Sequence, residues 1–320
     1  MEPLPRGANF LRAKLLWEIG LQIAGDPATP YYGNRDMCIT VGSGSGESFR
    51  PWMRMSTGSP ILAHAVARGE LELALVNPSG LLTQAYRGTG LFKEALPVRV
   101  IANYPSWDRF VYMIHPRTGL SSLAEIKERR YPLRVSVRED ATHSTRVLLD
   151  QTLEVYGFTL ADLQSWGGTL QLNGGPGDKR RLDALEAGTI DAIFDEGISV
   201  WFEKALKAGM KPITLENFAF AKLVALGWRR VSIPAGRFTS LSVEHSCIDF
   251  SGWPLYTRAS LPDETAYKVC AAIQAREEQI RWEASYTGLA QLGQNTDATP
   301  LDVPLHPGAA HWYREQGFKI

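Results

Sequence analysis

The chain has 320 residues, and its 34 Lys and Arg residues balance 34 Asp and Glu residues. A formal net charge of zero excludes the strongly basic surface of most nucleic-acid-binding proteins and gives no general attraction to an anionic membrane. The length suits one large or two modest domains, and an apolar fraction of 44% is that of a globular protein. No metal-ligand spacing occurs, so we expect no metal ion; the cysteines are Cys38, Cys247 and Cys270.

The first predicted element is an amphipathic helix over Asn9–Ala24. Arg12, Lys14 and Glu18 interrupt its apolar run, and it lacks both an uninterrupted hydrophobic region and an Ala-x-Ala cleavage site. The pattern therefore does not indicate a signal peptide, and on this ground a cytoplasmic location stays open. No other run is long enough to cross a membrane, so we expect no membrane insertion.

The stretch Ile39–Leu82 predicts a strand, a Gly/Ser loop, a short strand, a turn, a helix, a strand and a second turn. The helix follows a Thr-Gly-Ser-Pro turn, in which Ser59 suits the N-cap and Pro60 the first helical position. Leu71–Val76 has the composition of a buried strand and leads into the polar turn Asn77–Ser79. This stretch therefore places two polar turns where strands hand over to helices.

These polar turns are candidate ligand contacts. Backbone N–H groups at a helix start attract anions, and open α/β sheets bind ligands at the carboxyl ends of their strands. The Gly/Ser loop has the spacing of neither a dinucleotide-binding loop, a P-loop nor a nucleophile elbow, so we expect no cofactor. Turns and helix caps use the same residue types, which leaves a purely structural interpretation open for each candidate. The candidates in this stretch are Ser43, Thr57, Gly58, Ser59, Asn77 and Ser79.

After this stretch, strands alternate with helices. The expected strands are Pro97–Asn103, Phe110–His115, Leu133–Val137, Ile190–Phe194, Pro212–Leu215, Leu223–Ile233 and Cys247–Tyr256. The expected helices are Arg146–Tyr156, Lys179–Gly188, Val200–Gly209 and Asp263–Ser285. The order helix, glycine, strand, polar turn occurs in ILAHAVARGELELALVNPSG and again in LDALEAGTIDAIFDEG, so we interpret the second unit as a copy of the first.

The second unit supplies a second set of candidates. Paired carboxylates at a strand end could do acid–base chemistry, bind a cationic or hydroxylated group, or pair with an arginine, and a capped turn is the structural alternative. The candidates here are His143, Ser144, Thr145, Asp195, Glu196 and Trp201. Aromatic residues are usually core residues, but some could form cleft walls: Tyr104, Trp107, Trp201 and Trp253. One of four arginines could clamp an acid, namely Arg50, Arg54, Arg138 or Arg146.

Three passages resemble a known family: STGSPILAHAVARGELELALVNPSGL, VRVIANYPSWDRFVYMIHP and the tail PLHPGAAHWYREQG. They are similar to the TAXI family of solute receptors of TRAP transporters, within the type II periplasmic-binding-protein superfamily. The resemblance covers most of the sequence, from about Met37 to Ile280. It implies that the turn with Asn77 and Ser79 faces a ligand cleft, and that the loop before the helix at Ser144 contacts the ligand.

The resemblance also implies the architecture. We expect an α/β protein of two lobes, each a mixed sheet flanked by helices, with a ligand cleft between the lobes. Lobe one is expected to comprise residues 1–115 and 234–320, and lobe two residues 116–233. Two crossover strands would then form the hinge.

Three functions follow as hypotheses. The favoured one is a solute-binding protein that closes over a small organic anion, with a carboxylate as the first choice, for TRAP-type uptake in the periplasm. Its partners would be TRAP membrane subunits. The alternative is a cytoplasmic enzyme of lyase or decarboxylase type on the same scaffold, with His143, Asp195 and Glu196 as the acid–base group. A cytoplasmic ligand sensor without a transporter is the third hypothesis.

Overall fold

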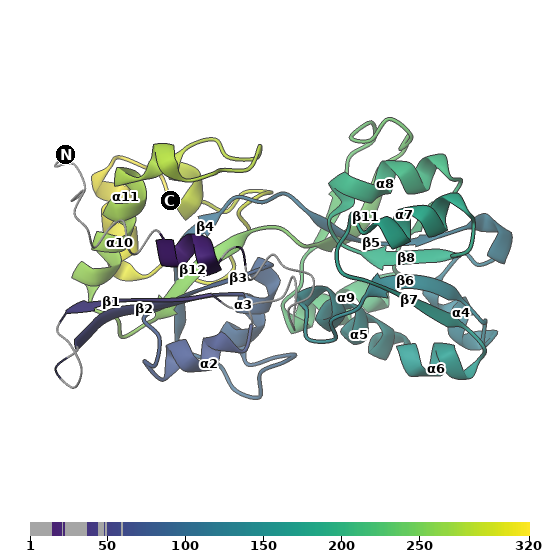
Figure 1. Cartoon of the computed structure of the whole chain (residues 1–320), viewed down its shortest axis with the longest axis horizontal. Coiled ribbons are helices and arrows are strands. Elements are labelled where there is room, and N and C mark those ends of the chain that lie inside the picture. Colours follow the sequence, from purple (N-terminus) through teal and green to yellow (C-terminus); the bar gives the residue numbers. More distant parts are fainter. Residues whose placement is uncertain (1–14, 21, 23–36, 44–47, 49, 59) are drawn as a thin grey trace.

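Strand pairing divides the chain into two mixed sheets (Figure 1). The computed structural model describes residues 15–20, 22, 37–43, 48, 50–58 and 60–320. The first sheet has the order β1-β2-β3-β12-β4, and the second has the order β10-β11-β5-β8-β6-β7, with β9 also paired to β5. Their strands are β1 (Cys38–Ser43), β2 (Arg50–Gly58), β3 (Leu73–Val76), β4 (Val98–Tyr104), β5 (Arg109–Ile114), β6 (Arg134–Arg138), β7 (Thr169–Asn173), β8 (Ala192–Asp195), β9 (Lys211–Ile213), β10 (Arg230–Ile233), β11 (His245–Asp249) and β12 (Trp253–Arg258).

Helices cover both faces of each sheet (Figure 1). Beside the first sheet, α2 and α3 lie on one face and α10 and α11 on the other; beside the second, α7 and α8 lie opposite α4, α5, α6 and α9. These helices are α2 (Leu62–Ala67), α3 (Ser79–Arg87), α4 (Leu123–Glu128), α5 (Ser144–Tyr156), α6 (Leu160–Ser165), α7 (Lys179–Glu186), α8 (Ile198–Lys207), α9 (Asn217–Leu226), α10 (Asp263–Ala275) and α11 (Pro307–Glu315). The predicted α/β class, with two mixed sheets flanked by helices, is thereby confirmed.

Strand β5 shows why the second sheet is buried on both faces. Its side chains alternate, as in any strand: Val111 and Met113 pack into the cluster that contains Trp201 of α8. Phe110 and Tyr112 point the other way, into the larger cluster that also contains the inward residues of α5. All six residues of β5 are buried, which explains why the sequence here is an almost continuous apolar run.

The chain passes between the sheets twice, in two adjacent segments that join β4 to β5 and β11 to β12. The Phe250 N–H donates to the Asp108 carbonyl (3.1 Å), and the Gly252 N–H donates to the Ser106 carbonyl (2.9 Å). Gly252 has φ +77°, and a Cβ there would lie 2.4 Å from the Ser79 hydroxyl, so this crossover packs directly against the start of α3. By strand pairing, β5 and β11 lie in the second sheet, while the expected lobe boundaries stay a prediction.

Several expected element boundaries are wrong. The strand expected over Leu223–Ile233 is confined to its last four residues, because α9 extends to Leu226 and strand β10 begins only at Arg230. The helix expected to reach Ser285 ends at Ala275. Helix α2 begins at Leu62, with Ile61 in the N-cap position, and not at Pro60.

The helix expected over Asn9–Ala24 is seen in part: residues 15–20 and 22 are helical, and the rest of that range lies outside the described residues. Within the described ranges, no helix is long and apolar enough to cross a membrane.

Candidate functional site

Thr57 and Gly58 are the last two residues of β2, which pairs with β1 on one side and with β3 on the other. The Thr57 N–H donates to the Met37 carbonyl (3.1 Å), and the Thr57 hydroxyl accepts from the Met37 N–H (2.9 Å). Gly58 has φ +101°, a backbone conformation that favours glycine. Ser59 and the side chain of Ser43 lie outside the described residues. The Thr57 hydroxyl is therefore engaged with the residue that precedes β1.

The turn from β3 into α3 contains two candidate polar residues, Asn77 and Ser79, and within the described residues only Ser79 forms a side-chain hydrogen bond. Ser79 is buried; its hydroxyl accepts from the Asn103 side-chain amide (3.1 Å), and its N–H donates to the Ser251 carbonyl (3.2 Å). The residue at the N-cap of α3 is Pro78, which forms no side-chain cap. The side-chain oxygen of Asn77 is buried and accepts no hydrogen bond from the described part of the chain. Asn77 is therefore the open polar group of this turn.

The start of α5 is capped by a neutral histidine. His143 occupies the N-cap, and its Nδ1 accepts from the Thr145 N–H (3.2 Å). Burial, with a further effect of the Arg138 guanidinium, lowers the pKa of His143 to about 4. At neutral pH the imidazole is therefore uncharged, as an acceptor in a cap must be. The half-buried Ser144 is the first residue of the helix.

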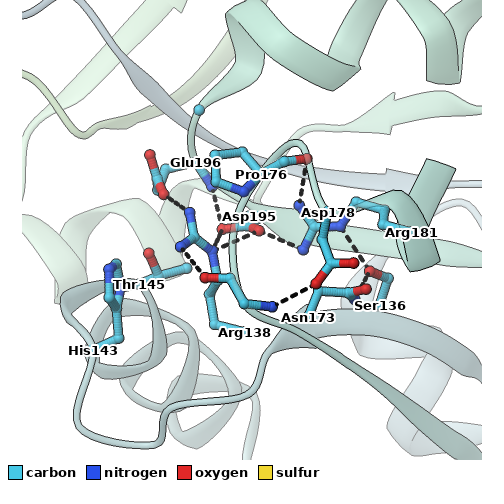
Figure 2. A network of polar contacts seen from close by, with 12 residues as sticks. Ser136, Arg138, His143, Thr145, Asn173, Pro176, Asp178, Arg181, Asp195 and Glu196 are labelled. Carbon is cyan, nitrogen blue, oxygen red and sulfur yellow. Dashed lines mark hydrogen bonds and ion pairs between the residues drawn. The ribbon is translucent and has the colours of Figure 1, made fainter. Parts of the chain in front are cut away.

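Thr145 is the unusual residue of this helix start. It is fully buried, yet its hydroxyl has no hydrogen-bond partner among the described residues. A buried hydroxyl without a partner costs free energy, so such groups are rare in folded proteins. Figure 2 shows Thr145 and His143 on the side of Arg138 where Glu196 also lies, opposite Arg181.

The carboxylates at the end of β8 lie in a network of ion pairs (Figure 2). Arg138, at the end of β6, donates through Nε to both oxygens of Asp195 (3.1 and 3.0 Å) and through Nη2 to Glu196. Arg181 of α7 approaches Asp195 from the other side, with Nη2 2.5 Å from Oδ2. Asp195 and Arg181 are completely buried, and Arg138 is 6% exposed. Parallel strands β6 and β8 bring these groups together, because their carboxyl ends meet at one edge of the sheet.

A second layer of side chains surrounds Arg181 and the backbone of Glu196. The Ser136 hydroxyl accepts from Arg181 Nε (2.8 Å) and from the Asn173 amide (2.7 Å). Trp201 is fully buried; its indole N–H donates to the Glu196 carbonyl (2.7 Å), and its ring centre lies 5.9 Å from the guanidinium carbon of Arg181. The Trp201 ring thus supports the network from the core side.

Asp108 joins the first crossover segment to this network. Its carboxylate accepts from the first N–H groups of α8, at Gly197 (2.8 Å) and Ile198 (3.3 Å). Burial raises the pKa of Asp108 to about 7, although backbone N–H groups at Gly197, Arg109 and Ile198 oppose the shift. The helix that follows Glu196 is therefore capped by a residue of the crossover segment.

The two halves of the chain also meet away from the crossovers. Gln84 of α3 and Gln151 of α5 form a reciprocal pair of amide hydrogen bonds, each 3.2 Å long. The Trp228 indole N–H donates to the same Gln151 oxygen (2.6 Å). These contacts fix α3 against α5, so the two helix starts that carry Asn77 and Thr145 belong to helices in direct contact.

The arrangement is suited to binding an anion. Both oxygens of Asp195 are bonded to arginine side chains, so this carboxylate orients Arg138 and Arg181 and has no oxygen left for a ligand. The described residues line two larger cavities, of about 680 and 420 Å³, and neither includes a residue of the network. The case for a site here consequently rests on polar geometry: a helix start, a hydroxyl without a partner and a buried guanidinium.

The structure brings four predicted residues to one place and shows what sequence reasoning missed. His143, Thr145, Asp195 and Glu196 lie around Arg138, which was one of four arginines considered. The network residues that were not predicted are Arg181, Asp108, Ser136 and Asn173. Among the other three arginines, Arg54 pairs with Glu72 at 2.7 Å and Arg146 donates to the Arg138 carbonyl at 3.1 Å.

Several solved structures are similar to this chain at low identity. The alkanesulfonate-binding protein SsuA from Xanthomonas axonopodis pv. citri, bound to MOPS, is 13% identical with a TM-score of 0.30; the match covers 69% of this chain and 63% of that one. Lactococcal OpuAC in complex with glycine betaine is 10% identical with a TM-score of 0.36, over 81% of this chain and 85% of that one. ProX from Borrelia burgdorferi is 12% identical with a TM-score of 0.37, over 68% and 73%.

Identities and TM-scores this low give no information on the ligand. The family comparison is stronger, because it matches residues 51–317 and so includes both sheets apart from β1 and the first residue of β2. This chain belongs to the NMT1-like family.

Proposed function

We propose that this protein is a solute-binding protein that closes over a small organic anion, with a carboxylate as the first choice. The observation that carries the proposal is the buried Thr145 hydroxyl, which has no partner among the described residues and lies at the start of a 13-residue helix. The N-terminus of a helix carries partial positive charge and free N–H groups, which favour an anion. Arg138 adds a full positive charge on the same side of the site (Figure 2).

The ligand would bind between the two sheets and their helices. Asn77 offers a buried, open oxygen at the start of α3, and Thr145 offers a hydroxyl at the start of α5. The two crossovers, joined by hydrogen bonds at Asp108 and Ser106, would act as the hinge. Lobe one would then contain the first sheet with the C-terminal helices, and lobe two the second sheet.

The finer form of the proposal is TRAP-type uptake. It is supported by the passages that resemble TAXI receptors, STGSPILAHAVARGELELALVNPSGL among them. On this hypothesis the protein works in the periplasm, and closure of the lobes is what TRAP membrane subunits detect. The energy of closure would come from contacts that the ligand makes with both lobes at once.

A thermal-shift screen against small organic acids tests the proposal. A ligand at a hundredfold excess over its dissociation constant stabilises the folded state by about 2.7 kcal/mol, a shift that is easily measured. We expect at least one carboxylate to raise the melting temperature and to be recovered unchanged. Consumption of the bound acid would instead make the protein an enzyme, and the absence of any shift with any acid would contradict the proposed function.

A further inference from the structure

The network contains two carboxylates that differ in how firmly they are held. Asp195 is completely buried, lies between Arg138 and Arg181, and accepts a further hydrogen bond from the Glu196 N–H (2.9 Å). Its removal would uncover two buried cations at once, which is strongly unfavourable. Asp195 is therefore a permanent part of the site.

Glu196 is held by far less. Its side chain is 12% exposed, and within the described residues Arg138 is the one side chain to which its carboxylate is bonded. Its backbone is fixed independently, since its carbonyl accepts from Trp201 and its N–H donates to Asp195. The carboxylate could turn away without disturbing β8 or α8.

Arg138 is oriented for an exchange of partners. Asp195 fixes its Nε, so the guanidinium plane stays in place whatever binds the outer nitrogens. Nη2 pairs with Glu196, and Nη1 has a long contact of 3.4 Å to the Gly174 carbonyl. A planar guanidinium binds a carboxylate through two parallel N–H groups, so these outer nitrogens are a suitable fork for an oxyanion.

We infer that Glu196 occupies the place on Arg138 that the ligand's carboxylate takes, and that binding exchanges one carboxylate for the other. This inference rests on the proposed function. In the free protein Glu196 keeps the buried guanidinium paired, because an unpaired buried charge is costly. In the complex the oxyanion bonds to Arg138 and to the Thr145 hydroxyl, and Glu196 turns toward solvent. Glu196 thereby sets the affinity, since every ligand must displace it.

Replacing Glu196 tests the exchange. The variant Glu196→Gln keeps the size of the side chain but removes the charge that competes for Arg138. Because a hydrogen bond to a charged group is about twice as strong as a neutral one, we expect the variant to bind an acid about tenfold more tightly than the wild type. The matched control is Glu139→Gln, which removes the same charge from a half-exposed carboxylate that pairs with Arg180.

The measurement is isothermal titration calorimetry of wild type, both glutamine variants and Glu196→Asp, with acetate, propionate, succinate and benzoate as probes. The shorter aspartate keeps the charge but pairs less closely with Arg138, so we expect this variant also to bind the acid more tightly than the wild type; it also serves if the glutamine variant fails to fold. Wild-type affinity in Glu139→Gln shows that the gain is not a general effect of charge.

Two results would overturn the inference: one leaves the proposed function intact, and the other overturns the proposed function as well. If the wild type binds an acid and both Glu196 variants bind it equally well or more weakly, Glu196 is not the competitor, while the proposed function stands. If none of the four proteins binds any of the acids, the proposed function fails together with the inference. Binding by the Glu196 variants alone supports the exchange, because the competing carboxylate then masks the site in the wild type.

Discussion

Two threonines of α5 allow ligand binding to be separated from folding. Thr145 is buried with a hydroxyl that has no partner among the described residues. Thr152, two turns later, is equally buried, but its hydroxyl donates to the Leu148 carbonyl (2.9 Å) and accepts from the Tyr112 hydroxyl (2.6 Å). Valine replaces threonine with almost the same shape and is also β-branched, so helix propensity changes little.

The two valine variants should have opposite effects. Thr145→Val removes an unsatisfied buried group, so we expect the free energy of unfolding to stay the same or to rise by about 1 kcal/mol. It also removes a hydrogen bond to a charged ligand, worth about 1.5–3 kcal/mol, so affinity should fall about tenfold to a hundredfold. Thr152→Val breaks two satisfied hydrogen bonds and leaves Tyr112 without its acceptor, so we expect a loss of about 1–3 kcal/mol in stability and unchanged affinity.

Urea denaturation gives the stabilities, and calorimetry with the acid found by the thermal-shift screen gives the affinities. A loss of stability in Thr145→Val would show that its hydroxyl already has a partner in the free protein. Unchanged affinity in that variant would remove Thr145 from the binding site. Either result would refute the assignment of the start of α5 as the anion site.

Three further predictions concern charged and titrating groups. Burial raises the pKa of Asp108 to about 7, so the folded state binds a proton between pH 4 and 7 that the unfolded state releases, and this group's contribution to stability falls as the pH rises. The stability of wild type minus that of Asp108→Asn should therefore increase as the pH falls from 7 toward 4, by at most about 1.4 kcal/mol per pH unit in urea titrations, and a flat difference would contradict the raised pKa. The NMR shifts of His143 should stay constant between pH 5.5 and 8, because its pKa is lowered to about 4; a midpoint near 6.5 would show that its cap is open. Asp297→Asn should weaken the pairing with the buried Arg109 and lower the stability by about 1 kcal/mol or less, since the Asp297 side chain is 64% exposed; a larger loss by denaturation would mean that this pair is essential to the crossovers.

Local sequence patterns predicted the elements well where one periodicity dominated. Helix α5 contains the whole expected range Arg146–Tyr156 and begins two residues earlier, at Ser144, and its buried residues Leu149, Leu153 and Tyr156 recur at helical spacing. The run before Gly227 failed because apolar residues occur at nearly every position, which suits a buried strand and a buried helix equally. The pairing of β5 and β11 within the second sheet depends on contacts about 140 residues apart in sequence, which no local pattern encodes.

Two parts of the candidate site were predictable from sequence: the start of α5 and the end of β8. The rest of the network was not. Polar residues after a buried strand or before a helix marked Thr145 and Glu196, because that position has a physical role in ligand binding. Arg181 gave one weak signal: it lies four residues before the apolar Leu185 in an expected helix, a spacing that places both side chains on one face. Asp108 gave none, since its partners at the start of α8 are 89 and 90 residues away.

Charge balance explains how a buried site of this kind can be stable before a ligand binds. Arg138 and Arg181 carry two positive charges, and Asp195 and Glu196 carry two negative ones, so the free network is neutral and each guanidinium is paired. A site with the arginines alone would attract acids more strongly, but its unpaired buried charges would destabilise the folded state. Exchange of Glu196 for a ligand carboxylate keeps the number of ion pairs constant throughout binding. The affinity then depends on what the ligand gains beyond Glu196, which is the hydrogen bond from Thr145 and the N-terminus of α5.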